Sequence, residues 1–150
     1  MSGIKIIAKN KRAHFDYFLS DKTEAGLCLQ GTEVKSLRDG KVSLAEAFVT
    51  IDQKFELWLI NMTIPHYSHG NQFNHDPTRK RKLLVHKKEA RQLFKTMQMK
   101  NLTLIPTALY FKKSRVKLEI ALAKGKKLYD KRQVEAKKSA EKKIKQKDYT

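Results

Sequence analysis

The segment 115–122 carries the pattern that most restricts how this chain can fold. Its apolar residues Val116, Leu118, Ile120 and Leu122 alternate with Lys117 and Glu119. Such alternation predicts a β-strand with one buried face and one polar face. A strand of this kind requires neighbours, because an unpaired edge leaves backbone hydrogen-bonding groups exposed. The rest of the chain must therefore supply further strands.

Those further strands are expected at 4–8, 14–19, 24–30, 45–51, 55–60, 82–85 and 102–111. The first is expected to be an edge strand. Segments 14–19 and 24–30 should pair around the polar turn Ser20-Asp21-Lys22, and segments 45–51 and 55–60 around a short loop. Segment 102–111 should pair with 115–122, and Pro106 indicates an edge or a bulge in it.

The sequence also predicts two helices. A short one over 32–40 has Thr32 as a candidate N-cap and Gly40 as a stop. A longer one ends near Asn101. Its apolar stripe consists of Ala90, Leu93, Phe94 and Met97. Because no βαβ rhythm is present, the expected fold class is mainly β: an antiparallel barrel of the oligonucleotide-binding kind, with inserted helices and a basic C-terminal tail.

The chain divides into a folding part and a charged appendage. Its 150 residues, 40% of them hydrophobic, are sufficient for a single core. We expect a barrel domain over 1–123 and a basic tail over 124–150. The tail's apolar residues are too sparse to dock a helix on the barrel, although its helix propensity is good. It is therefore expected to be disordered when free and helical where phosphates neutralise its lysines.

The formal net charge of +18 far exceeds what solubility requires. Nucleic acid is the first candidate partner and an anionic membrane surface the second. The tail lacks the Trp, Phe and Leu face of an interfacial helix, which argues against a membrane. Without an apolar leader or span, a cytoplasmic, reducing location is expected. Cys28, the single cysteine, lies in an apolar alternation and is expected to be buried.

An enzymatic function finds little support. The sequence has no Gly-rich phosphate loop, no nucleophile elbow and no HExxH pattern. Three histidines, His66, His69 and His75, fall in one long loop with only Asp76 as a carboxylate, which is a thin ligand set for zinc. We therefore expect no catalytic residues, no metal and no cofactor.

A nucleic-acid-binding function is favoured by several basic features that occur together. Lys35 and Arg38, three residues apart, share a helix face that can meet either solvent or a ligand. The loop segment 76–82 is strongly basic. The segment 122–132, LAKGKKLYDKR, surrounds Tyr129 with lysines and an arginine. Cations contact phosphates and exposed rings stack on unpaired bases, as RNA recognition requires.

Five blocks identify a family resemblance. They are Asn10-Lys11-Arg12-Ala13, Glu24-Ala25-Gly26, GTEVKSLRDGK (31–41), FNHDPTRKRKLL (73–84) and LAKGKKLYDKR (122–132). In order and spacing they resemble the small protein B family, which binds transfer-messenger RNA in bacteria. The resemblance implies an oligonucleotide-binding-type barrel and a role in trans-translation, the rescue of stalled ribosomes. It also implies partners: transfer-messenger RNA, small-subunit ribosomal RNA, and elongation factor Tu with GTP and the alanyl-charged RNA. We expect a monomer.

The resemblance assigns site residues. For the RNA-gripping barrel face it implies Asn10, Arg12, Glu24 and Leu84, to which the helix pattern adds Lys35 and Arg38. For the tail that enters the decoding region and message channel it implies Gly125, Lys126, Lys127, Tyr129, Asp130, Lys131 and Arg132. The sequence departs from the commonest family form at His14-Phe15 and at Tyr129. Without the resemblance, Glu24 would be assigned to a surface salt bridge and Leu84 to the core.

A different reading remains open at this point. A ribosomal or assembly protein that binds ribosomal RNA through the same barrel would have the same charge and fold.

Overall fold

A computed structural model describes residues 3–68 and 74–126 of the chain. In this part, the strands form one antiparallel sheet. They are β1 (Ile4–Lys9), β2 (Tyr17–Leu27), β3 (Phe48–Ile51), β4 (Leu57–Ile60), β5 (Arg81–Leu84), β6 (Thr103–Lys112) and β7 (Arg115–Gly125). The mainly β, barrel-type fold class expected from the sequence is confirmed.

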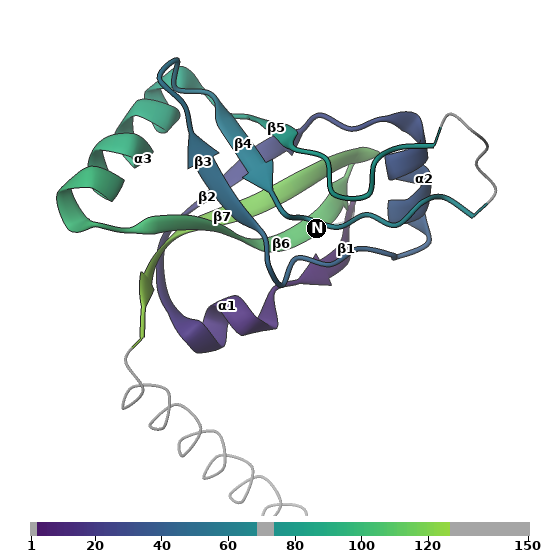
Figure 1. The fold of residues 1–150 in the computed structure, drawn as a ribbon, viewed down its shortest axis with the longest axis horizontal. Helices are drawn as coiled ribbons and strands as arrows, with labels where there is room; N and C mark the ends of the chain where they lie inside the picture. Colours follow the sequence, from purple (N-terminus) through teal and green to yellow (C-terminus); the bar gives the residue numbers. More distant parts are fainter. Residues whose placement is uncertain (1–2, 69–73, 127–150) are drawn as a thin grey trace, which may run out of the picture.

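The sheet closes on itself to form a barrel. Its strand order is β1-β6-β3-β4-β5-β2-β7, and β6 also pairs with β7. The closed circuit therefore runs β6-β3-β4-β5-β2-β7, while β1 lies outside it against the second half of β6 (Figure 1). The predicted edge character of segment 4–8 is thus correct. Closure pairs the edge of β7 that an open sheet would expose, and leaves β1 as the edge strand.

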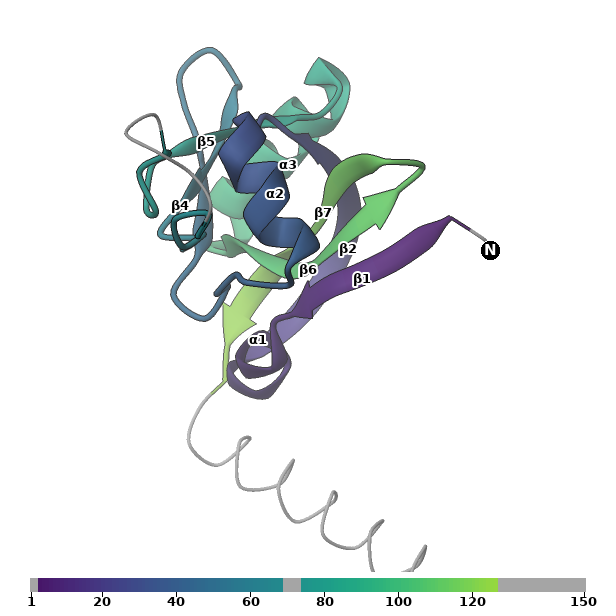
Figure 2. The same cartoon turned by 90° about the vertical axis from the view of Figure 1, so that its right-hand side faces the viewer.

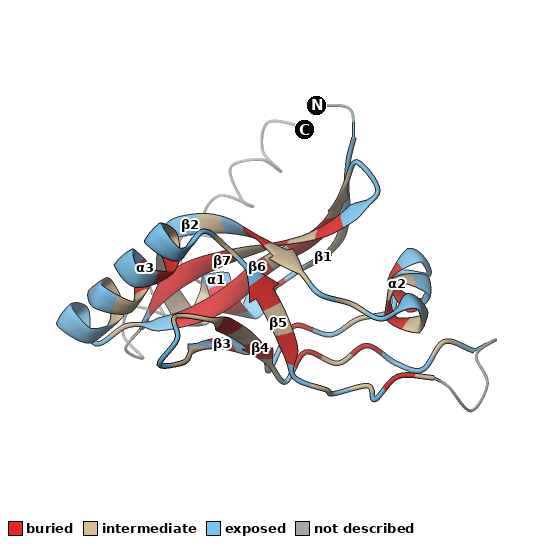
Figure 3. Ribbon diagram, turned by 90° about the horizontal axis from the view of Figure 1, so that it is seen from above, coloured by how far each residue is buried: buried red, intermediate tan, exposed pale blue. Residues whose placement is uncertain are grey.

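The core fills the barrel with the inward-facing residues of each strand. In β7, Val116, Leu118, Ile120 and Leu122 are all buried, as the alternation predicts. They pack with Leu57, Leu59, Leu83, Leu109 and other aliphatic residues from the remaining strands. Figure 3 shows this buried side running along β6 and β7.

Two helices lie at opposite sides of the barrel. They are α2 (Gly31–Arg38) and α3 (Lys87–Lys100), which lie at opposite ends of the view in Figure 1, whereas in Figure 2 α3 lies behind α2. α3 packs Ala90 and Leu93 into the core and ends at Asn101, which adopts the left-handed conformation (φ 52°) of a helix C-terminus. The prediction of this helix is confirmed. α2 buries Leu37 in the same core.

A third helix, α1 (Lys11–Asp16), occupies residues expected to form a strand. The strand prediction for 14–19 is therefore wrong over its first half. Asn10 Oδ1 accepts a hydrogen bond from the backbone N–H of Ala13, which caps the helix. Ala13 is buried against Ile105 and Ala123 on the outer side of β6 and β7. These contacts override the β propensity of the aromatic residues in the segment.

The expected turn at Ser20-Asp21-Lys22 is also wrong. β2 is one continuous strand that pairs with β7 on both sides of this tripeptide. A register shift between Ser20 and Thr23, with Asp21 at φ 50°, marks a bulge where the sequence indicated a turn. The polar residues therefore bend a strand and do not end it. By contrast, the pairing of β3 with β4 and of β6 with β7 is as predicted, and the bulge expected at Pro106 lies between Pro106 and Ala108.

Three smaller predictions need correction. α2 begins at Gly31 and its N-cap is Gln30, whose backbone N–H donates to Glu33 Oε1 at 2.8 Å, whereas Thr32 lies inside the helix. Cys28 is exposed, because its neighbours Leu27 and Leu29 turn inward. Finally, β7 continues two residues beyond position 123, where we expect the barrel domain to end.

None of the helices in the described residues is long and apolar enough to cross a membrane.

Candidate nucleic-acid interface

One row of residues crosses five strands on the outside of the barrel. The register pairs Ile6 with Tyr110, Tyr110 with Lys117, Lys117 with Gly26, and Gly26 with Leu84. Directly paired residues share a face of the sheet, so this row forms one continuous surface. Together with the adjacent Glu24 and Lys112, which contact each other, it is called the outer sheet face below.

The two ends of the row are apolar and exposed. Ile6 is 53% exposed and Leu84 is 54% exposed, although both residues are large enough to fill a core. The core assignment of Leu84 is therefore wrong, and the surface position implied by the family resemblance holds. At Gly26, a Cβ atom would lie 3.3 Å from Leu84 Cβ. The absence of a side chain at Gly26 therefore lets Leu84 lie close against the backbone of β2, two residues along the strand from Glu24.

Glu24 is held by residues of β6. Tyr110 Oη donates to Glu24 Oε2 at 2.5 Å, and Lys112 Nζ lies 3.4 Å from both carboxylate oxygens. The hydrogen bond from Tyr110 is the largest influence on the pKa of Glu24 and, with Lys112, lowers it against the opposing effect of burial. Burial and the contact with Glu24 raise the pKa of Tyr110. At neutral pH, Glu24 is therefore an ionised hydrogen-bond acceptor.

Asn10 is the N-cap of α1 and Arg12 lies in this helix, which packs on the outer side of β6 and β7. Asn10 is buried, and its Nδ2 donates to the carbonyl oxygens of Pro106 (2.9 Å) and Leu44 (3.4 Å). Asn10 therefore supports α1, and the RNA contact expected of it stays a prediction. Arg12 has a 64% exposed side chain and forms ion pairs with Asp16 (3.3 Å) and Glu46 (3.1 Å).

A cavity of about 590 Å³ lies between α1 and the start of β6. Its lining includes Arg12, Asp16 and Glu46 around residues such as Phe48 and Ile105.

Lys35 and Arg38 lie on α2, away from the outer sheet face. Both residues are exposed, and Lys35 Nζ is 5.7 Å from the centre of the Tyr67 ring. They form a separate basic surface, which the structure leaves accessible.

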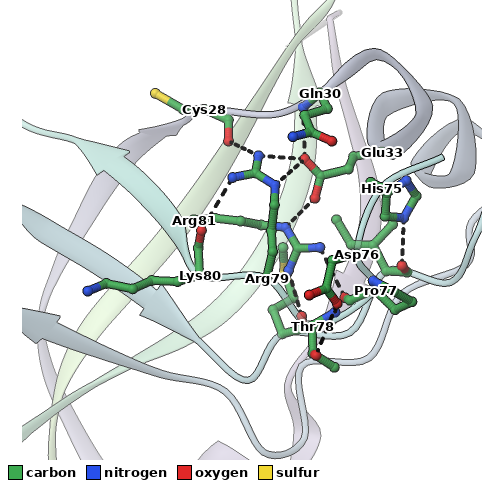
Figure 4. Close-up of polar contacts among 12 residues, drawn as sticks. Cys28, Gln30, Glu33, His75, Asp76, Pro77, Thr78, Arg79, Lys80 and Arg81 are labelled. Carbon is green, nitrogen blue, oxygen red and sulfur yellow. Dashed lines mark hydrogen bonds and ion pairs between the residues drawn. The ribbon is translucent and has the colours of Figure 1, made fainter. Parts of the chain in front are cut away.

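The basic loop 76–82 is only partly available to a ligand. Glu33, fully buried on α2, accepts hydrogen bonds from Arg79 Nη2 (2.7 Å) and Arg81 Nε (2.5 Å) (Figure 4). Arg81 is fully buried and also donates to the carbonyl oxygens of Met62 (2.6 Å) and Pro77 (3.0 Å). These two arginines hold the loop to α2, so the loop presents less basic surface than its sequence suggests.

His75 belongs to the same internal structure. Its Nε2 lies 2.7 Å from the carbonyl oxygen of Ile64, and its Nδ1 lies 2.8 Å from the hydroxyl of Thr32. A carbonyl can only accept, so Nε2 carries a proton; in the neutral ring Nδ1 then accepts from the Thr32 hydroxyl. Among the residues that the structure describes, no group of three or more potential metal ligands comes together. His69 lies outside them.

Two of the proposed tail residues are described. Gly125 ends β7 opposite Tyr17, and the backbone N–H of Lys126 donates to the carbonyl of Asp16 at 2.8 Å. The chain therefore leaves the barrel beside α1. The remaining tail residues of the prediction, Lys127, Tyr129, Asp130, Lys131 and Arg132, lie outside the described part of the chain.

Four residues of the outer sheet face were not predicted from the sequence: Ile6, Tyr110, Lys112 and Lys117. The alternation of β7 already turns Lys117 outward, so this residue could have been found. Tyr110 could not, because the bulge after Pro106 changes which residues of β6 face outward.

Comparison with known proteins agrees with this geometry. The family model described as SmpB protein matches residues 7–149. The SsrA-binding protein of Bifidobacterium adolescentis is 57% identical over 131 residues, which cover 87% of this chain and 82% of that protein. That of Carboxydothermus hydrogenoformans is 53% identical over 140 residues, covering 93% of each.

A solved structure is also similar. It is described as "tmRNA-SmpB: a journey to the center of the bacterial ribosome", and the matching chain superposes with a TM-score of 0.68 at 45% sequence identity. The match covers 81% of this chain and 85% of that one. The family model alone spans far more than half of the sequence. On these grounds, the chain belongs to the SmpB protein family.

Proposed function

We propose that this protein binds the tRNA-like domain of transfer-messenger RNA through its outer sheet face and acts in trans-translation. The observation that carries the proposal is the exposure of Leu84 beside an ionised Glu24 in a protein of net charge +18. A purely electrostatic RNA binder has no use for either residue, whereas recognition of unpaired nucleotides needs both apolar contacts and acceptors. Membership of a family whose relatives are named SsrA-binding proteins supports the same conclusion.

The residues divide into three kinds of contact. Leu84 and Ile6 offer apolar surface against an unstacked base. Glu24 offers a hydrogen-bond acceptor to a base edge. Lys112 and Lys117 on the same face neutralise phosphates, and the separate surface formed by Lys35 and Arg38 extends this electrostatic contact.

The remaining expectations complete the proposal. The residues from Gly125 to Arg132 enter the decoding region and the empty message channel of the ribosome. The protein accompanies alanyl-charged RNA with elongation factor Tu and GTP, acts as a monomer in the cytoplasm, and is a binding factor and not an enzyme. The exit of the chain beside α1, at Lys126, supports a tail that can extend away from the outer sheet face.

The proposal is tested by comparing Leu84→Ala with Met99→Ala. Met99, on α3, is 73% exposed, so both changes remove an exposed apolar side chain. Leu84→Ala should weaken binding to the isolated tRNA-like domain by about tenfold, since burying a leucine side chain fully contributes about 1.5–3 kcal/mol and Leu84 is already partly covered in the free protein. Met99→Ala should leave binding unchanged. Affinities are measured by fluorescence anisotropy with labelled RNA.

Equal affinities for Leu84→Ala and the unaltered protein would contradict the assignment of this face. Tighter binding to a fragment of ribosomal RNA than to the tRNA-like domain would favour the alternative of a ribosomal or assembly protein.

A further inference from the structure

The two oxygens of the Glu24 carboxylate have different surroundings. Oε2 accepts a 2.5 Å hydrogen bond from Tyr110 Oη, while within the described part of the chain Oε1 has only the 3.4 Å contact with Lys112 Nζ that both oxygens share. A carboxylate oxygen has two lone pairs, so Oε1 keeps accepting capacity toward solvent. The Glu24 side chain is 39% exposed, which leaves this oxygen within reach of a ligand.

Tyr110 is fixed more firmly than the carboxylate that it contacts. The residue is only 9% exposed and lies in the second half of β6, in register with Ile6 on one side and Lys117 on the other. A buried phenol has few rotamers, so its hydroxyl is a rigid donor. Exposed glutamate side chains otherwise sample many rotamers, and fixing one in advance of binding lowers the entropic cost of recognition.

From this geometry we propose that Tyr110 is a positioning residue for RNA recognition: it holds Glu24 Oε2 so that Oε1 accepts a hydrogen bond from an amino or imino N–H of an unpaired base. The inference rests on the proposed function and adds the ligand group and the residue that orients its acceptor. An ionised carboxylate is negatively charged, so it repels phosphates. It can only accept hydrogen bonds, so its partner in the RNA must be a donor. Leu84, across Gly26, offers apolar surface to a flat base and favours a base over a ribose hydroxyl.

Glu119 provides a natural comparison on the same side of the sheet. It is in register with Glu24, but it contacts the Thr107 hydroxyl (2.9 Å) and Lys22 (3.8 Å). It therefore carries the same charge close to Glu24 without the contact to Tyr110. A Glu119→Gln variant controls for the removal of one negative charge from this surface.

If Tyr110 positions Glu24, removing its hydroxyl should change the pKa of Glu24; if Tyr110 only packs in the sheet, it should not. The charged and titratable groups around Glu24 are Tyr110 and Lys112 from β6, Lys117 and Glu119 from β7, and Lys22 near Glu119. Of these, the Tyr110 hydroxyl has the largest lowering effect on the pKa of Glu24. Tyr110→Phe removes the hydroxyl and keeps the ring, so the pKa of Glu24 should rise while the core contacts persist.

The experiment measures affinity for the tRNA-like domain in Tyr110→Phe, Glu24→Gln, Glu24→Asp and Glu119→Gln. Carboxyl-carbon NMR titration of Glu24 and thermal melts are recorded in parallel. Tyr110→Phe should bind about 3- to 10-fold more weakly, the usual effect of one lost hydrogen bond. Glu24→Gln removes the charge, and Glu24→Asp keeps the charge but withdraws the carboxylate from Tyr110. Both variants should therefore bind the RNA at least as weakly as Tyr110→Phe. Glu119→Gln should not weaken binding.

The outcomes separate this inference from the proposed function. If Glu24→Gln weakens binding but Tyr110→Phe and Glu24→Asp do not, Glu24 contacts RNA and the positioning role is wrong. If Glu24→Gln itself has no effect, the Glu24 contact in the proposed function fails. An unchanged Glu24 pKa in Tyr110→Phe would also overturn the positioning role. If Tyr110→Phe does not fold, Glu24→Asp decides alone, because it leaves the tyrosine in place.

Discussion

At the scale of single residues, Glu33 connects two arginines of the segment 76–82 to helix α2. It is fully buried, as is Arg81, and its second arginine partner, Arg79, is largely covered. Burial raises the pKa of Glu33, but hydrogen bonds from Arg79, the Gln30 backbone and Arg81 outweigh it, and the net effect is a lowered pKa. A buried charge that loses its partner is strongly destabilising.

We expect Glu33→Gln to lower the free energy of unfolding by about 3–5 kcal/mol, because it leaves Arg81 buried without a counter-charge. The matched control is Glu46→Gln, whose exposed ion pair with Arg12 should contribute less than about 1 kcal/mol. Urea unfolding followed by circular dichroism measures both. Similar midpoints for the two variants would show that the buried pair contributes little.

The ionisation of Glu33 also makes the stability of the fold depend on pH. A carboxylate with a lowered folded-state pKa stabilises the fold fully above its unfolded value, about 4.3. That contribution is lost as the pH falls through the folded-state pKa. Stability should therefore decrease under acid more steeply in the unaltered protein than in Glu33→Gln.

At the scale of elements, the end of β7 determines where the barrel can be cut. Lys124 and Gly125 pair with Phe18 and Tyr17 of β2, and the Lys126 N–H donates to Asp16 at the end of α1. These last residues of the strand connect α1 and β2 to the rest of the sheet. The expected boundary at 123 would remove all of these contacts.

A chain ending at Lys126 should keep the stability and RNA affinity of the full protein and lose ribosome rescue. A chain ending at Ala123 should have a free energy of unfolding about 1–3 kcal/mol lower than the chain ending at Lys126, because it loses a few backbone hydrogen bonds. Thermal or urea melts of the two truncations measure the difference. Identical stabilities would place the domain boundary at 123, as the sequence pattern suggests.

Elements with a clear period were predictable, and elements decided by distant contacts were not. The alternation of Val116 to Leu122 and the apolar stripe of α3 correspond to the observed strand and helix. α1 was not predicted, because Ala13 is buried by residues from β6 and β7 that lie far along the chain. For the site, Glu24 and Leu84 came from the family resemblance. Tyr110 depends on the bulge in β6, and no local pattern reveals it.

At the scale of the whole molecule, charge and shape contribute separately to binding. A net charge of +18 predicts that RNA affinity falls with salt, by about 0.7–0.9 in log affinity per phosphate contact for each decade of salt concentration. Glu24 adds nothing to this electrostatic attraction and lowers the local positive charge.

Glu24→Ala should therefore weaken specific binding at every salt concentration while leaving the salt slope nearly unchanged. Lys117→Ala should reduce the slope by nearly one phosphate contact. Titrations over a salt series, with an unrelated duplex RNA as a control, separate the two effects. Tighter binding of the tRNA-like domain by Glu24→Ala would assign Glu24 to a surface ion pair only.

The order of the strands also determines when the barrel can close during synthesis of the chain. Of the strands that the structure describes, β7 is the last to be made, yet it lies between β2 and β6 and closes the barrel. The hairpin of β3 and β4 can form early, because its contacts are local, whereas β2 must wait for a partner from the far end of the chain. A chain released before residue 115 would expose the edges of both β2 and β6, and such edges recruit other chains. The barrel can close only when β7 is present, so copies that terminate before this strand are expected to aggregate or be degraded.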